Sequence, residues 1–154
     1  MLRDAQADDL ETLWRIDQKC FAEGIAYSKP ELRFFMRRRG SFTLVGTDEG
    51  SGEIAGFIVA HGGAVGHIIT IDVIAAARRT GLGSQLLLAA EERLRLAGSR
   101  AVSLESAVDN LSALKFYKRH GYTVVETRPG YYSNGVDALV LNKRLSNPQK
   151  AAQR

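Results

Sequence analysis

Arg-Arg-Thr-Gly-Leu-Gly-Ser, at residues 78–84, separates two segments whose apolar side chains recur with different periods. Upstream, residues 67–74 are rich in β-branched side chains and apolar on both faces, which is typical of a central strand. Downstream, residues 81–97 carry an apolar side chain every three or four positions, a pattern that predicts a helix ended by Gly98. Residues 78–84 are therefore expected to lead from a buried strand into the N-terminus of a helix.

This loop has the composition of a phosphate-binding site. The first N–H groups of a helix have no partner within it and carry partial positive charge. Gly81 and Gly83 let the backbone approach a phosphate without an intervening Cβ, and Arg78 and Arg79 add positive charge. A Gly-x-Gly alone more often marks an ordinary turn, but the basic pair and the strand–loop–helix context favour a phosphate site. The loop lacks the Gly-Lys-Ser/Thr of a Walker loop, and Leu86 stands where the dinucleotide fingerprint needs a third glycine.

The other segments indicate one domain that mixes helices and strands. Residues 7–20 have a stripe at helical period that includes Ile16 and Asp17, and Ser28 to Glu31 has the form of a capping box. Helices are expected at 7–20, 28–39, 81–97 and 110–120, and strands at 1–4, 42–47, 53–61, 67–74, 101–106, 122–128 and 136–144. This order is not a run of βαβ units, so a mixed sheet is expected. Residues 1–145 form the expected domain, and residues 146–154 an expected flexible tail.

Composition is that of an ordinary soluble globular protein. Hydrophobic residues make up 45% of the 154 residues and charged residues 25%, and no apolar run is long enough to cross a membrane. The first residues lack the apolar region of a signal peptide. Cys20 is the single cysteine, so no internal disulfide can form and a cytoplasmic location is expected. His61, His67 and His120 do not have the spacing of metal ligands, and no metal site is expected.

The net charge of +4 and the pI near 9.4 indicate an acidic partner. The run Arg37-Arg38-Arg39 raises the possibility of nucleic-acid binding, but no recognised nucleic-acid motif accompanies it. Cations at the end of a helix also complement its dipole. A small polyanionic cofactor accounts for the excess of basic residues more economically.

Residues 78–83 resemble the Arg/Gln-x-x-Gly-x-Gly/Ala signature of the GNAT acetyltransferase superfamily. The resemblance implies an α/β (α+β) GNAT fold with a mixed, mostly antiparallel sheet of six to seven strands and about four helices. It also implies acetyl-CoA as the cofactor, with the pantetheine arm along the strand before the loop and the pyrophosphate on the loop amides. The cofactor-binding residues implied there are Ile71, Asp72, Val73, Arg78, Arg79, Thr80, Gly81, Leu82, Gly83 and Ser84.

The segment from Leu104 to Tyr122 is similar to a later motif of the same family, which places Asn, Ala, Tyr and then Gly-Phe/Tyr at these spacings. Asn110, Ala113 and Tyr117 would share one face of a helix and could follow an extended ligand. The alternative is that Ala113 and Tyr117 belong to the core and that Asn110 only caps the helix. The resemblance implies that all three contact acetyl-CoA.

The subgroup that the chain most resembles is the ribosomal-protein-alanine N-acetyltransferases (RimI-like), which acetylate protein N-termini. Glu105 matches the catalytic glutamate of that subgroup and Tyr117 its proton-donating tyrosine. Residues 128–138 look like its Arg-x-x-Tyr-Tyr…Asp-Ala run, which helps to form the peptide pocket. The implied substrate-binding residues are Phe21, Tyr27, Tyr131 and Tyr132. The loop at 21–28 lacks the usual Phe-Pro-x-x-Trp, which leaves the identity of the acetyl acceptor open.

These assignments predict direct attack of an amine on the thioester. Glu105 would act as general base through a water, Tyr117 as general acid, and an N–H near Val73 would polarise the acetyl carbonyl. Cys20 has no histidine brought to it by a motif, which disfavours a covalent relay. The expected partner is a protein N-terminus, with a ribosomal protein as one candidate, and the chain would be a monomer or homodimer. A small amine or lysine acceptor, and a non-catalytic acetyl-CoA sensor, remain as alternatives.

Overall fold

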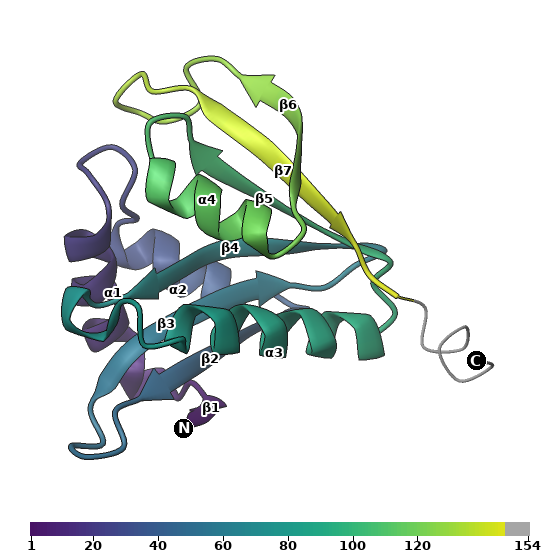
Figure 1. The fold of residues 1–154 in the computed structure, drawn as a ribbon. Helices are drawn as coiled ribbons and strands as arrows, with labels where there is room; N and C mark the ends of the chain where they lie inside the picture. The colour runs from purple at the N-terminus through teal and green to yellow at the C-terminus, as the bar shows by residue number, and fades with distance from the viewer. Residues whose placement is uncertain (147–154) are drawn as a thin grey trace.

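Seven strands form a single sheet in the order β1-β2-β3-β4-β5-β7-β6 in the computed structural model, which describes residues 1–146 (Figure 1). Every neighbouring pair is antiparallel except β4 and β5. The strands are β1 (Leu2–Asp4), β2 (Ser41–Thr47), β3 (Ile54–His61), β4 (Val65–Val73), β5 (Ala101–Ala107), β6 (Thr123–Arg128) and β7 (Ala138–Arg144). The helices are α1 (Leu10–Cys20), α2 (Lys29–Arg37), α3 (Leu82–Leu96) and α4 (Leu111–Arg119), with 3₁₀ turns η1 (Ala7–Asp9) and η2 (Ala75–Ala77). The predicted mixed, mostly antiparallel fold is confirmed, and residues 147–154 of the expected tail lie outside the described residues.

Helix boundaries follow from local capping. At the start of α2, the Glu31 amide donates to Ser28 Oγ at 3.2 Å and the Ser28 amide to Glu31 Oε1 at 2.9 Å, as the capping box predicts. This helix ends at Arg37, earlier than expected, because Arg38 has an extended ψ of 137°. Helix α3 follows Gly81, whose φ of 89° is in the left-handed region that favours glycine.

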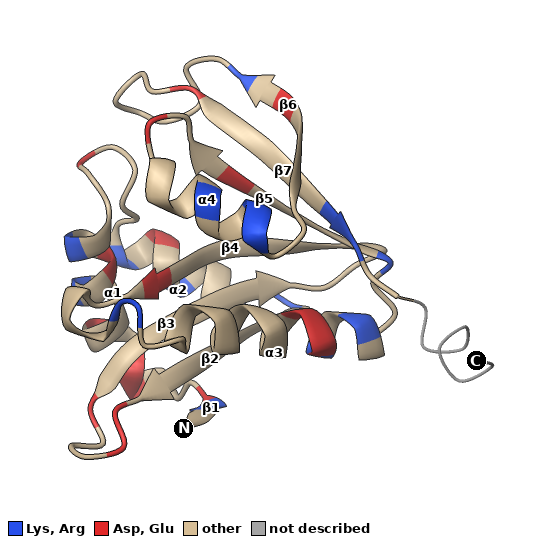
Figure 2. Ribbon diagram, in the orientation of Figure 1, with Lys and Arg blue, Asp and Glu red and all other residues tan. Residues whose placement is uncertain are grey.

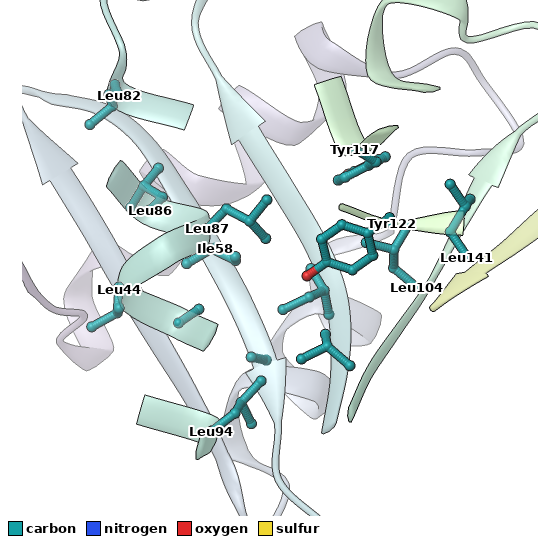
Figure 3. Packing of buried hydrophobic residues seen from close by; sticks show 14 of the residues in the cluster. Leu44, Ile58, Leu82, Leu86, Leu87, Leu94, Leu104, Tyr117, Tyr122 and Leu141 are labelled. Carbon is teal, nitrogen blue, oxygen red and sulfur yellow. The ribbon is translucent and has the colours of Figure 1, made fainter. Parts of the chain in front are cut away.

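The sheet is covered by helices on both faces, and each face has its own hydrophobic core. Helices α3 and α4 cover one face, where Leu86 and Leu87 pack with Ile58 and Leu104 of the sheet (Figure 3). Helices α1 and α2 cover the other face, where Leu13 and Leu32 pack with Val45, Phe57 and Val59. The two cores fix the sheet from both sides, so the path of β4 through its centre is rigidly set.

A buried polar cluster ties α3 to the far strands. Tyr122 Oη donates to Glu91 Oε2 at 2.7 Å, and Lys143 Nζ contacts Glu91 Oε1 at 2.8 Å. Burial and the hydrogen bond to Glu91 raise the pKa of Tyr122. Both oxygens of the buried carboxylate are thus paired, as a buried charge requires. Tyr122 is the last residue of the motif at residues 104–122, and its side chain is part of the core.

Strands β4 and β5 separate soon after they start, and this opens the sheet. Their parallel pairing covers only Val65–His67 against Ala101–Ser103. In the pairing with β3, Val59 opposes Thr70 and Ala60 opposes Ile68, so Ile69 is an extra residue without a partner. Such a bulge bends its strand and increases its twist. Beyond it, β5, β7 and β6 lean away from β4, as Figure 1 shows, and the rest of β4 has no strand on its β5 side.

Basic residues are distributed over several elements and do not form a single stripe. Figure 2 shows them on α2, on α4, at the end of α3 and in the loop before α3. The loop and α4 flank the opening between β4 and β5, where the sequence predicts a polyanionic cofactor. No helix among residues 1–146 is long and apolar enough to cross a membrane.

Candidate active site

The open side of β4 offers backbone groups at two of the three residues predicted to contact the pantetheine arm. The Ile74 amide donates to Ala55 O of β3 at 2.9 Å. Because antiparallel pairs alternate, the backbone groups of Asp72 also face β3, whereas those of Ile71 and Val73 face the opening. The Asp72 carboxyl lies beside Asp17 of α1 and Thr70 of β4. Ile71 and Val73 are therefore the residues placed to pair with an extended ligand.

The loop before α3 has the features of an anion-binding cradle. The first hydrogen bond of α3 runs from the Gln85 amide to Gly81 O at 3.0 Å, which leaves the amides of residues 82–84 without helical partners. A Cβ built on Gly81 would meet no atom within 4 Å, so the space beside it is open. Arg79, with φ of 65°, is the one non-glycine residue in the left-handed region among residues 1–146. Free amides, open space and exposed basic residues fit a pyrophosphate.

Arg78 and Ser84 make contacts that the sequence did not indicate. Arg78 Nε donates to Val73 O at 3.3 Å, and Cys20 Sγ contacts the same oxygen at 3.5 Å. The carbonyl of Val73 is therefore occupied, and its N–H is the group that faces the opening. Ser84 Oγ lies 2.9 Å from His120 Nε2, which connects the phosphate loop to the end of α4. Burial lowers the pKa of His120, so the imidazole is neutral at pH 7 and can accept from the hydroxyl.

Helix α4 closes the opening from the side of β5. Asn110 Oδ1 accepts from the Ala113 amide at 3.3 Å, so Asn110 caps the helix. Tyr117 is 8% exposed and belongs to the core on the α3 side, where its ring lies 5.8 Å from that of Tyr122. Burial raises the pKa of Tyr117, which keeps its hydroxyl protonated at neutral pH. A phenol held in this form can donate a proton but cannot act as a base.

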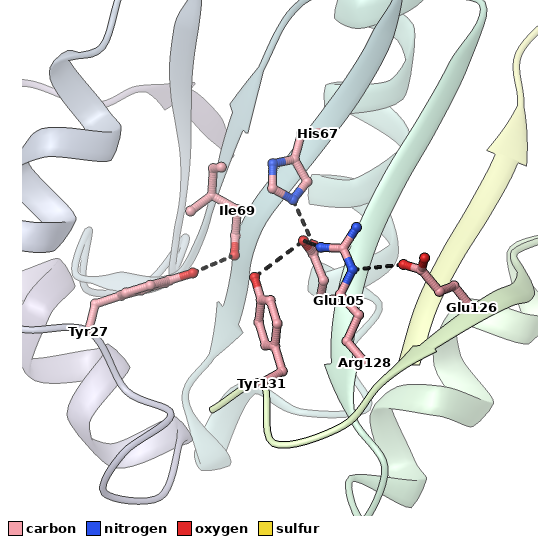
Figure 4. Close-up of polar contacts among 7 residues, drawn as sticks. All are labelled: Tyr27, His67, Ile69, Glu105, Glu126, Arg128 and Tyr131. Carbon is pink, nitrogen blue, oxygen red and sulfur yellow. Dashed lines mark hydrogen bonds and ion pairs between the residues drawn. The ribbon is translucent and has the colours of Figure 1, made fainter. Parts of the chain in front are cut away.

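Glu105 lies on β5 inside a cluster of polar side chains from three elements (Figure 4). Its side chain is 14% exposed, and Glu105 Oε2 lies 2.7 Å from His67 Nε2 on β4. Arg128 Nη1 lies 3.7 Å from Glu105 Oε1, and Tyr131 Oη donates to the same oxygen at 3.4 Å. The carboxylate is thus fixed where β4 and β5 begin to separate.

The charge state of Glu105 results from opposing effects. Burial raises its pKa, but the hydrogen bond and charge of His67, the charge of Arg128 and the bond from Tyr131 lower it more. The net result is a pKa below the usual range, so Glu105 is ionised at neutral pH. Ionised, it can accept a proton over the whole physiological pH range.

The two loops predicted to form the substrate groove contact each other. Ser133 Oγ donates to Gly24 O at 3.0 Å, and Asn134 Nδ2 donates to Glu23 O at 3.2 Å. Gly24 has φ of 87°, and a Cβ there would lie 2.7 Å from Asn134, so the contact requires glycine. The loop after α1 and the loop after β6 therefore meet across the opening.

These loops bring three of the four predicted substrate-binding residues together. Tyr27 Oη donates to Ile69 O at the bulge of β4, at 3.4 Å, and Tyr131 contacts Glu105. The rings of Tyr131 and Tyr132 meet edge to face at 5.0 Å. Burial first, and then the nearby Tyr131 and Glu105, raise the pKa of Tyr132. Phe21 is half-buried where α1 ends and its amide bonds to Asp17 O, so it lies at the base of its loop.

His67 and Arg128 are the site residues whose roles the sequence analysis missed. His67 was considered only as a metal ligand, and Arg128 only as part of a motif. The signal for His67 was its place at the start of a strand expected to contact the cofactor. Its partner Glu105 is 38 residues away in the sequence, so their contact could not be predicted from local patterns. Among residues 1–146, no three His, Cys, Asp or Glu side chains gather as metal ligands.

Known proteins of similar sequence and fold point to one family. A family model described as the acetyltransferase (GNAT) family matches residues 10–122. N-alpha-acetyltransferase 30 of Schizosaccharomyces pombe is 28% identical over 136 residues, which cover 84% of this chain and 88% of that protein. The crystal structure of Ard1 from Thermoplasma volcanium aligns with a TM-score of 0.86 at 27% identity, covering 95% of this chain and 97% of that one. The ribosomal-protein-S18-alanine N-acetyltransferase of Escherichia coli shares the fold, with a TM-score of 0.83, 22% identity and coverage of 95% and 94%.

The family match covers well over half of the chain, including the phosphate loop, β5 and α4. The opening in the sheet and the free amides before α3 provide what an extended ligand with a pyrophosphate requires. The chain therefore belongs to the GNAT acetyltransferase family and is an acetyl-CoA-dependent acetyltransferase.

Proposed function

We propose that this enzyme acetylates the N-terminal α-amino group of a protein, as the RimI-like enzymes do. The observation that carries the proposal is the position of Glu105. It lies ionised beside the opening that would hold acetyl-CoA, and under the tyrosine-lined loops that would hold a peptide. Relatives named N-alpha-acetyltransferases support the same acceptor.

The choice of an α-amine follows from acid–base chemistry. An α-amino group has a pKa of about 8, against about 10.4 for lysine. At pH 7 roughly one α-amine in ten is neutral, but fewer than about one lysine in a thousand. An enzyme whose base is a carboxylate of low pKa cannot easily deprotonate lysine. An α-amine substrate avoids most of this difficulty, because part of it is already neutral at pH 7.

In the proposed mechanism, each catalytic side chain holds or moves one proton. Acetyl-CoA supplies a thioester already activated toward amines. Glu105 takes a proton from the attacking amine through a water, and His67 and Arg128 keep the carboxylate ionised for this task. The Val73 N–H faces the opening and can donate to a carbonyl oxygen there. Tyr117 Oη holds the proton that the departing sulfur needs.

Cellular context is proposed from the same observations. With Cys20 as its single cysteine, the chain suits the reducing cytoplasm. A ribosomal protein is our candidate substrate, and residues 1–145 our candidate catalytic domain, as monomer or homodimer. A pull-down of acetylated N-termini from cells with and without the enzyme would identify the substrate.

The acceptor can be tested by measuring coenzyme A release with a panel of amines. We expect turnover with peptides that have a free N-terminus, and none with the same peptides blocked at that position. Turnover on spermidine or free lysine alone would overturn the α-amine proposal and leave a small-amine acetyltransferase. Binding of acetyl-CoA without turnover on any acceptor would favour the sensor alternative.

Replacing Tyr117 by phenylalanine tests the proposed proton donor. We expect kcat to fall about 10²-fold or more, because the departing sulfur loses its acid. Little stability should be lost, since the ring stays buried and the hydroxyl is the part removed. Stopped-flow and steady-state assays would measure the rate. The role is excluded if kcat is unchanged while the pH profile matches that of the wild type.

A further inference from the structure

Two carboxyl groups are buried together between α1 and β4, outside the catalytic cluster. Asp17 is 0% exposed and Asp72 is 1% exposed, and the two carboxyl groups lie within hydrogen-bonding reach of each other. Asp17 Oδ1 and Asp72 Oδ2 are buried, and neither oxygen has a hydrogen-bond donor among the described residues. Two carboxylate oxygens can bond to each other only when one of them carries a proton. Two buried, unpaired negative charges in contact would be strongly unfavourable.

The remaining oxygens of the pair connect the substrate loop to the bulge in β4. Asp17 Oδ2 accepts from the Tyr27 amide at 2.8 Å, and Asp72 Oδ1 accepts from Thr70 Oγ1 at 2.6 Å. Thr70 follows the bulged residue Ile69, whose carbonyl accepts from Tyr27 Oη. Tyr27 is thus tied to β4 through its backbone by the pair and through its hydroxyl directly.

We propose that Asp17 and Asp72 are positioning residues that share one proton, and that this proton holds the loop of residues 21–28 against β4. Loss of the proton would separate the two side chains and release Tyr27 from the groove. The expected effect on peptide binding rests on the proposed function, because it requires that the groove binds a peptide. The shared proton does not depend on that function. The expected consequence is weaker peptide binding at high pH.

The buried ionisable groups around Asp17 and Asp72 stay neutral, so the shared proton of the pair is the one expected to titrate. Burial first, and then the contact between the two side chains, raise the pKa of Asp72, and burial raises that of Asp17. Burial, and secondarily Asp72, raise the pKa of Cys20 to about 11, while the nearby Arg78 opposes this rise. Burial also raises the pKa of Tyr27 and of Tyr117, so both stay neutral. Glu31 of α2 adds negative charge near Asp17 and disfavours loss of the shared proton.

The sign of the pH effect follows from proton binding. Because the folded protein holds a proton that the unfolded chain releases above pH about 4, wild-type stability falls as pH rises toward the raised pKa of the pair. Within that window the unfolding equilibrium constant should increase by up to about tenfold per pH unit. Asp72→Asn carries permanent amide hydrogens in place of the shared proton, so its stability should lack this dependence on pH. Asp17→Asn keeps the oxygen that accepts from the Tyr27 amide and can donate to Asp72, so its stability should also lack this dependence.

Urea unfolding of the full chain from pH 5 to pH 9 tests the shared proton without any assumption about the acetyl acceptor. We expect the wild-type unfolding constant, divided by that of Asp72→Asn or Asp17→Asn, to rise with pH. Asp8→Asn removes an exposed carboxylate on η1 and should give a curve parallel to the wild type. Parallel curves for all variants would overturn the proposal.

Peptide kinetics test the positioning role. At pH 7, Asp17→Ala should raise the KM for a peptide about tenfold with a smaller change in kcat, and Asp17→Asn should restore it to near the wild-type value. Equal KM values in Asp17→Ala and the wild type would overturn the positioning role. If the wild type acetylates no peptide, the proposed acceptor is wrong, and the urea curves still decide whether the proton is shared.

Discussion

Replacing Glu105 by glutamine is expected to lower kcat by about 10²–10⁴-fold, the usual contribution of a general base. Glutamine has the same shape and can still bond to Arg128 and Tyr131, but it cannot take up a proton. The dissociation constant for acetyl-CoA should stay within about twofold of the wild type, because Glu105 lies on the peptide side of the opening. Steady-state kinetics and calorimetry would measure the two effects.

Glu126→Gln is the matched control for this variant. Glu126 also pairs with Arg128, through Nε at 2.7 Å, but it is exposed on β6 and does not face the opening (Figure 4). We expect near wild-type turnover from it. A kcat for Glu105→Gln within about threefold of the control would remove Glu105 as the base and direct attention to His67.

Gly83→Asp is expected to weaken acetyl-CoA binding by about 10- to 100-fold while leaving the fold intact. A Cβ on Gly83 would lie 3.5 Å from the Phe116 ring and 3.7 Å from Val73, which are ordinary contacts. A carboxylate in the first turn of a helix suits the helix dipole, so stability should not fall. The negative charge would instead repel the phosphate from the free amides, and a hydrogen bond to a charged group is worth about 1.5–3 kcal/mol.

Gly62→Asp provides the control for this loss. Gly62 follows β3, at the other end of β4 from the phosphate loop, and its added Cβ would lie 3.5 Å from Gly40 O. Calorimetric titration of acetyl-CoA and thermal unfolding should be run on both variants. Equal affinity of Gly83→Asp and Gly62→Asp for acetyl-CoA would show that the pyrophosphate does not rest on these amides.

Local signals in the sequence were sufficient to predict the elements. The strand-to-helix change around residues 78–84 predicted β4 and α3, and the Ser28–Glu31 box predicted the start of α2. These features depend on neighbours within a few positions, so they can be read without a fold. The end of α2 was predicted less well, because nothing in Arg38 itself indicates an extended backbone.

The geometry of the site depends on contacts between distant segments, and the sequence alone could not provide it. The opening lies beside a bulge at Ile69, in a strand whose pattern otherwise looks regular. The contact of His67 with Glu105 joins β4 to β5, and that of Gly24 with Ser133 joins two loops 109 residues apart. In the sequence, Asp17 was placed in the apolar stripe of the helix expected at residues 7–20. A carboxyl group on the buried face of a helix needs a hydrogen-bonding partner there, and this was the signal that the sequence offered.

The acetyl acceptor is identified most directly by the position of the acetyl group on a peptide that carries both a free N-terminus and an internal lysine. The enzyme, acetyl-CoA and this peptide would be incubated at pH 7, and the product fragmented in a mass spectrometer. We expect one acetyl group on the α-amine and none on the lysine. Acetylation of the lysine with a free N-terminus remaining would rule out the proposed N-terminal acceptor.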